Sequence, residues 1–118
     1  YDNVTNAFYP KSGRGFTREN RIKPDLTAPA VNVYGPGISG GYIRRTGTSV
    51  ACALGAGACA QILQWGIVED NEPYMKNNYI KNYLIRGAER NRDIRYPSEQ
   101  WGYGTINVFD SFLILTRT

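Results

Sequence analysis

The chain has 118 residues, enough for one domain, or for part of a larger one, with a modest hydrophobic core. Hydrophobic residues make up 42% and charged residues 20%, the balance of an ordinary soluble globular protein. Fourteen Lys and Arg against 10 Asp and Glu give a net charge of +4, spread along the chain. Because the cations form no dense run, the composition argues against a nucleic-acid-binding protein.

The first part of the chain shows few regular patterns. Residues 1–23 are polar and punctuated by glycine, which predicts loops and strand fragments. The run VNVY at 31–34 predicts a short buried strand, and YIRR at 42–45 predicts a second extended piece. Between them, GPGISG at 35–40 matches the letters of the dinucleotide-binding fingerprint. No helix is predicted to start there, so we do not expect a nucleotide site.

The most regular segment is 49–65, rich in Ala and Gly, which predicts a helix that ends at Gly66. It is apolar nearly all round, and this predicts burial on every side. It falls short of the roughly 20 residues that a membrane span needs. Cys52 and Cys59 share one face of this helix about 10 Å apart, too far for a disulfide. We expect both to be small buried core residues.

Two shorter helices are predicted in the second half of the chain. The first covers residues 78–86 and stops at Gly87. The second covers residues 108–115, with Asn107 as its N-cap. The apolar side chains of this last helix that are expected to pack inward are Phe109, Phe112 and Leu113.

Ser49 stands in the first turn of the long predicted helix. On spacing alone the favoured interpretation is a simple N-cap, which serine often provides. The position would also suit an acyl-transfer nucleophile, since its own amide and the positive helix end can stabilise an oxyanion. The chain contains no histidine, the usual base of such a nucleophile. Without histidine or a paired-cysteine pattern, no common zinc set is present, and we expect neither metal nor cofactor.

The residues around Ser49 favour the nucleophile. GTSVA, preceded by RIKPDLTAPAVNV and SGRGF, resembles the serine-nucleophile segment of the subtilisin-like serine proteases. The Ala–Gly helix and WGYGTINV resemble the closing segments of that family, and the resemblance covers nearly the whole chain. TGTSVA, KNYLIRGA and WGYG together look most like the clostridial spore-germination type. An α/β-hydrolase is disfavoured, because Ala51 replaces the last glycine of its elbow and no histidine follows.

The resemblance implies an α/β fold with three layers around a mostly parallel central sheet, of which residues 1–118 are the C-terminal segment of the peptidase domain. Ser49 would be the nucleophile and its backbone N–H one oxyanion donor, and Thr48 would support the oxyanion region. The family order Asp, His, Ser places the other triad members, and an oxyanion asparagine, upstream. The chain alone is therefore expected to be inactive, and the spacing gives no support to Lys23 or Lys81 as a substitute base.

The partners implied by the resemblance are a peptide or protein substrate and the upstream part of the same domain. No cofactor, nucleic acid or membrane span is part of this interpretation. The sequence leaves the compartment open, and the resemblance implies a secreted or spore-associated protein.

Departures from the family pattern keep other hypotheses open. Ala30 stands where the family's APG has glycine, so the local turn is expected to differ. The helix entry replaces Met, Ser, Pro and His of the common pattern by Val50, Cys52, Ala53 and Leu54. These changes keep open a non-catalytic relative that acts as a binding or signalling protein. A third hypothesis, an independent basic binding module, predicts a chain that folds alone and binds polyanions in a salt-sensitive way.

Overall fold

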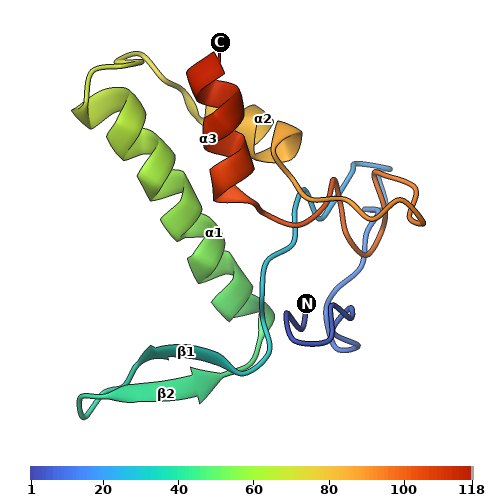
Figure 1. Ribbon diagram of the computed structural model, residues 1–118. Helices are drawn as coiled ribbons and strands as arrows, with labels where there is room; N and C mark the ends of the chain where they lie inside the picture. The colour runs from blue at the N-terminus through green and yellow to red at the C-terminus, as the bar shows by residue number, and fades with distance from the viewer. Residues whose placement is uncertain (118) are drawn as a thin grey trace.

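A β-hairpin that leads into a long helix dominates the computed structural model, which describes residues 1–117 (Figure 1). Strands β1 (Val33–Pro36) and β2 (Tyr42–Arg45) pair antiparallel. Both predicted extended pieces are present, but β1 begins late because Asn32 has a positive φ of 50°. The predicted burial of this strand is wrong, since none of its residues is buried and Tyr34 is 63% exposed. This hairpin is the whole of the sheet within residues 1–117, so the expected parallel strands are not found there. Helices and a small sheet give the chain the mixed content of an α/β fragment.

Helix α1 (Thr48–Leu63) continues directly into a π-helical turn, η1 (Gln64–Val68). The prediction that Gly66 caps the helix is wrong, because Gly66 lies buried inside this turn. A side-chain carbon there would meet Met75 Cε at 2.9 Å. The absence of a side chain at Gly66 therefore makes room for Met75 and does not end the helix.

The predicted burial of α1 on all sides is also wrong for the described residues. Only Ala58 and Ile62 of α1 are buried, Cys52 is exposed, and Leu54 keeps 42% of its surface accessible. Both cysteines are free thiols, as predicted, but the prediction that they are buried is wrong, because Cys52 is exposed and Cys59 is half-buried. The continuous helix Thr48–Val68 has 21 residues and a mean hydropathy of 1.4, so by length and composition it could cross a membrane. The prediction that this helix is too short to span a membrane is therefore wrong. Core helices of soluble proteins meet the same criteria, however.

Helices α2 (Asn77–Arg86) and α3 (Val108–Arg117) confirm the two shorter predicted helices and pack beside the second half of α1 (Figure 1). The Oδ1 atom of Asn107 accepts the Asp110 N–H at 3.0 Å, which confirms the N-cap. The buried hydrophobic cluster joins all three helices through Ala58, Ile62, Ile80, Leu84 and Leu115.

The inward packing predicted for the last helix is right for Phe112 and wrong for Phe109. The ring of Phe112 packs edge-on against Trp65, with the ring centroids 6.3 Å apart. Phe109 is 71% exposed. The inward stripe of α3 follows residues 108, 111, 112 and 115 at helical spacing, and Phe109 lies outside that stripe.

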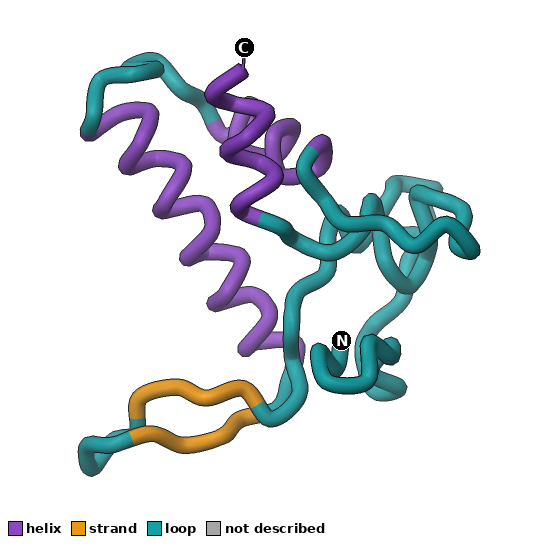
Figure 2. Tube along the Cα trace, in the orientation of Figure 1, coloured by secondary structure: helices purple, strands orange, loops and turns teal. Residues whose placement is uncertain are grey.

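Loops make up most of the chain that faces the first half of α1 (Figure 2). Three of these segments are held together by backbone pairing: Thr105 bridges to Thr27 in parallel and to Glu89 in antiparallel orientation. Gly102 has a φ of +56°, and a Cβ there would collide with the backbone of Asp25. The first glycine of the WGYG motif thus allows the backbone at 102 to lie close to the backbone of Asp25, in the segment that leads to the hairpin.

Candidate active site

Ser49 lies in the first turn of α1, directly after the hairpin, and is exposed. The helix begins at Thr48, one residue earlier than predicted, with Gly47 at the N-cap. No side chain caps this end, and the Val50 N–H donates to the Gly47 carbonyl at 3.1 Å. The interpretation of Ser49 as the N-cap is therefore wrong, and its hydroxyl is not used to hold the helix end.

The backbone amides of Thr48 and Ser49 are available to a ligand. Neither N–H donates a hydrogen bond to any acceptor in residues 1–117, as expected for the first turn of a helix. The first turn holds no acidic side chain that would neutralise the positive end of the helix dipole. This arrangement suits stabilisation of negative charge that develops beside the Ser49 hydroxyl.

Gly47 keeps the space beside the hydroxyl open, a role that sequence reasoning missed. Its φ of 156° and ψ of 161° fall in a region that is populated almost only by glycine. A Cβ at this position would lie 3.4 Å from Ser49 Oγ. The signal in the sequence was the glycine of the GTS turn, but the motif alone does not say which atom that glycine faces.

Two hydrogen bonds tie the helix entry to the segment before the hairpin. The Gly47 N–H donates to the carbonyl of the buried Ala30 at 2.8 Å, and the Asn32 N–H donates to Thr46 Oγ1 at 2.9 Å. A different turn is expected at Ala30, where alanine replaces the family's glycine. Ala30 does not have a positive φ, and the residue of this turn that does is Asn32. Asparagine tolerates the left-handed region better than most residues, so replacement of the family's glycine by alanine costs little here.

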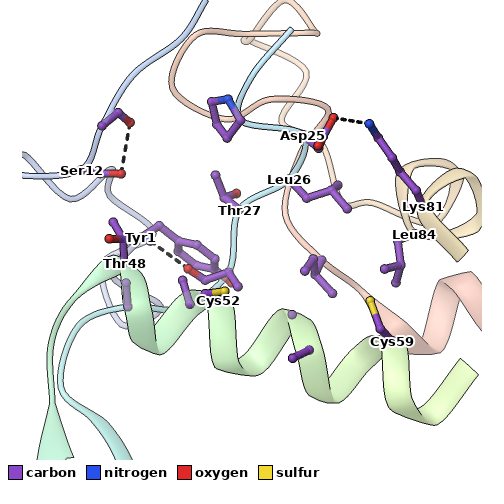
Figure 3. A pocket seen from close by; sticks show the side chains of 18 of the residues that line it. Tyr1, Ser12, Asp25, Leu26, Thr27, Thr48, Cys52, Cys59, Lys81 and Leu84 are labelled. Atoms are coloured by element: carbon purple, nitrogen blue, oxygen red, sulfur yellow. Dashed lines mark hydrogen bonds and ion pairs between the residues drawn. The ribbon is translucent and has the colours of Figure 1, made fainter. Parts of the chain in front are cut away.

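Neither of the two lysines considered as a substitute base is free to accept a proton from Ser49. Lys23 and Lys81 both pair with Asp25, with Nζ–Oδ distances of 2.6 and 2.8 Å. Burial raises the pKa of the Asp25 carboxyl, but hydrogen bonds from the two lysines outweigh it and hold the pKa below its usual value. Both ammonium groups are thus engaged by an ionised carboxylate. Asp25 and Lys81 lie away from the helix start, where Thr48 lies (Figure 3).

A largely apolar hollow of about 670 Å³ runs along one face of α1. Thr48, Cys52 and Cys59 line it from the helix, and Leu26 and Leu84 line it from the opposite side (Figure 3). Thr48 belongs to this lining and Ser49 does not, so the two predicted site residues are adjacent but face different surroundings. In residues 1–117, no group of three or more His, Cys, Asp or Glu is placed to hold a metal ion.

Comparison with known proteins assigns the family. The model of the Subtilase family matches residues 2–104, a range that includes Ser49 and the hairpin. Pyrolysin of Pyrococcus furiosus is 31% identical over 122 residues, which cover 98% of this chain and 8% of pyrolysin.

Solved structures agree with this assignment. The CspB protease of Clostridium perfringens superposes with a TM-score of 0.94 at 36% identity, over 100% of this chain and 26% of CspB. The prenylagaramide maturation protease PagA superposes with a TM-score of 0.63 at 26% identity, over 80% of this chain and 34% of PagA. The chain thus spans about a quarter of CspB and less than a tenth of pyrolysin. Since the family model covers most of the sequence and the fold matches a protease along its whole length, the chain belongs to the subtilase family of subtilisin-like serine proteases.

Proposed function

We propose that residues 1–118 are the C-terminal segment of a subtilisin-like endopeptidase domain and that Ser49 is its acylating nucleophile. The observation that carries the proposal is the geometry at the start of α1. An exposed serine hydroxyl, which has no hydrogen-bond partner among residues 1–117, stands beside two first-turn amides that are also unpaired there, and beside the open space at Gly47. This geometry falls inside the segment that the family model matches.

In the proposed reaction, Ser49 Oγ attacks the carbonyl carbon of a peptide bond. The hydroxyl proton passes to a base, and the carbonyl oxygen gains the negative charge. The Ser49 N–H donates a hydrogen bond to that oxyanion, and Thr48 supports the same region. When the amine leaves with the proton, an ester on Ser49 remains, and water then releases the acid product.

The base and the residue that orients it come from outside the described residues in this proposal. The sequence holds no histidine, and Lys23 and Lys81 are bound to Asp25. An upstream Asp and His of the same domain would complete the triad, so the isolated chain would not hydrolyse peptides. Most of the CspB protease lies beyond the part that this chain matches, which supports a larger catalytic domain.

The exposed face of α1 fits the same proposal. A helix of Ala and Gly with few buried residues, beside an apolar hollow, is suited to close packing against the remainder of a domain. The alternative, a membrane span, is disfavoured because the chain superposes along its whole length on a protease.

The 36% identity to CspB also supports the clostridial type of subtilase, and we extend the proposal to a role in sporulation or germination.

The test is peptide hydrolysis by the complete protein that carries this chain. Ser49→Ala is expected to lower kcat by about 10³-fold or more. Ser39→Ala, which changes an exposed serine in the hairpin turn, is the matched control and should keep full activity. A folded complete protein with its Asp and His that cleaves no peptide would instead support the non-catalytic relative that binds or signals.

A further inference from the structure

The charged residues nearest to the proposed nucleophile in the sequence are both positive. Between residues 26 and 68 the only charged side chains are Arg44 and Arg45, and no acidic residue occurs there. Asp25, just before this stretch, is paired with two lysines. Both arginines lie on β2, the strand that leads into the start of α1. Neither arginine forms an ion pair with an acidic side chain of residues 1–117.

The two arginines are held differently. The guanidinium of Arg44 lies over the ring of Tyr34 at 4.6 Å and donates to its hydroxyl at 2.7 Å. Arg45 points to the other face of the strand, since alternate residues face opposite sides. It is exposed, and its side chain has neither an ion pair nor a hydrogen bond with any of residues 1–117. The guanidinium of Arg45 is thus the one with all its donors free.

Arg45 lies close enough to Ser49 along the chain for its side chain to contact a bound peptide. Ser49 follows it by four positions, so their Cα atoms are at most about 14 Å apart along the chain. A bound peptide in extended form advances about 3.3 Å per residue. An arginine side chain at this distance can meet a peptide residue within about four positions of the bond that Ser49 attacks.

We infer that the natural substrate carries Asp or Glu within about four residues of the cleaved bond, and that Arg45 binds this carboxylate. Guanidinium and carboxylate form a charge-assisted, bidentate pair, which is stronger than a neutral hydrogen bond. Arg44, fixed on Tyr34, adds to the positive potential at the same edge. The inference rests on the proposed function of Ser49 and names the class of peptide that this site prefers.

This inference is tested with the complete protein and pairs of peptides that differ only by Glu or Gln at one position. The pairs cover each of the four positions on either side of the cleaved bond. At one position at least, kcat/KM should be about five- to tenfold higher for the Glu peptide. The ratio should fall in 1 M NaCl, where charges are screened within about 3 Å. Arg45→Gln should bring it close to one. Arg92→Gln, at an exposed arginine in a distant loop, is the control and should leave it unchanged.

The outcomes separate this inference from the proposed function. An active protein whose Glu and Gln peptides are cleaved equally at every position overturns the acidic preference and leaves Ser49 as the nucleophile. A preference that survives Arg45→Gln, with a circular dichroism spectrum that shows an intact fold, overturns the role of Arg45. A folded protein that cleaves no peptide overturns the proposed function, and the inference with it.

Discussion

Replacement of Gly47 by alanine is expected to impair the proposed reaction of the complete protein through the backbone alone. Gly47 has a φ of 156° and a ψ of 161°, a conformation that costs a residue with a Cβ about 1–3 kcal/mol. The added Cβ would also lie 3.4 Å from Ser49 Oγ, which the substrate carbonyl approaches in the proposed reaction. Alanine must either keep this conformation at that energetic cost or relax and carry Thr48 and Ser49 with it.

Both responses of Gly47→Ala have measurable consequences. A retained conformation lowers the free energy of unfolding by about 1–3 kcal/mol. A relaxed one moves the hydroxyl and the amides of the first turn, and a misplacement of about 1 Å reduces catalysis by about 10²-fold. We therefore expect a loss in the second-order rate of Ser49 labelling by a fluorophosphonate, a loss in stability, or both.

The assay measures the labelling rate and the urea unfolding midpoint of the complete protein. Gly35→Ala is the matched control, because Gly35 lies in the same hairpin and a Cβ there meets nothing within 4 Å. It should behave as the wild type in both measurements. Wild-type labelling and wild-type stability in Gly47→Ala would refute the view that this glycine shapes the site.

Three further predictions concern the stability of the complete protein. Asp25→Asn should destabilise it near neutral pH and progressively less in acid, as followed by urea unfolding against pH. The lowered pKa of Asp25 means that its contribution is present above the unfolded-state value of 3.8 and lost as the pH falls through the folded-state value; a pH-independent difference would contradict this. Ile62→Ala, at a fully buried position, should lower the free energy of unfolding by about 2–5 kcal/mol in the same assay. Asn107→Ala removes the cap of α3 and should cost about 1 kcal/mol, whereas Asn107→Asp should retain most of the stability.

The elements that the sequence predicted well are those whose signals are local. The cap residue Asn107 and the helical spacing after it predict α3, and the spacing of residues 78–86 predicts α2 within one residue. Phe109 shows the limit of this reasoning, since a phenylalanine one position off the buried stripe is exposed. The late start of β1 likewise depends on the φ of Asn32, which no periodicity reveals.

The burial of α1 could not be predicted, because it depends on what packs against the helix. An apolar pattern indicates that a surface will be covered, but it does not say by which segment. Gly66 was ambiguous for a similar reason: a glycine after an apolar run marks a cap or a close contact, and here it makes room for Met75.

For the candidate site, the motif located Ser49 but not the contacts that support it. The first turn differed from the prediction by one residue, an ordinary uncertainty at helix ends, and this decided against the N-cap. The bond from Gly47 to Ala30 joins segments on either side of the hairpin, so only the folded chain brings them together. The pairing of Lys23 and Lys81 with the same carboxylate was equally invisible to local patterns.

The central claim is that Ser49 is the nucleophile of a complete subtilase, and mapping a covalent adduct tests it most directly. The complete folded protein is treated with a fluorophosphonate and the modified peptide is sequenced by mass spectrometry. We predict one adduct, on Ser49, which is lost in Ser49→Ala and kept in Ser39→Ala. A folded protein with its Asp and His in place that carries the adduct on another residue, or carries none, would contradict the claim.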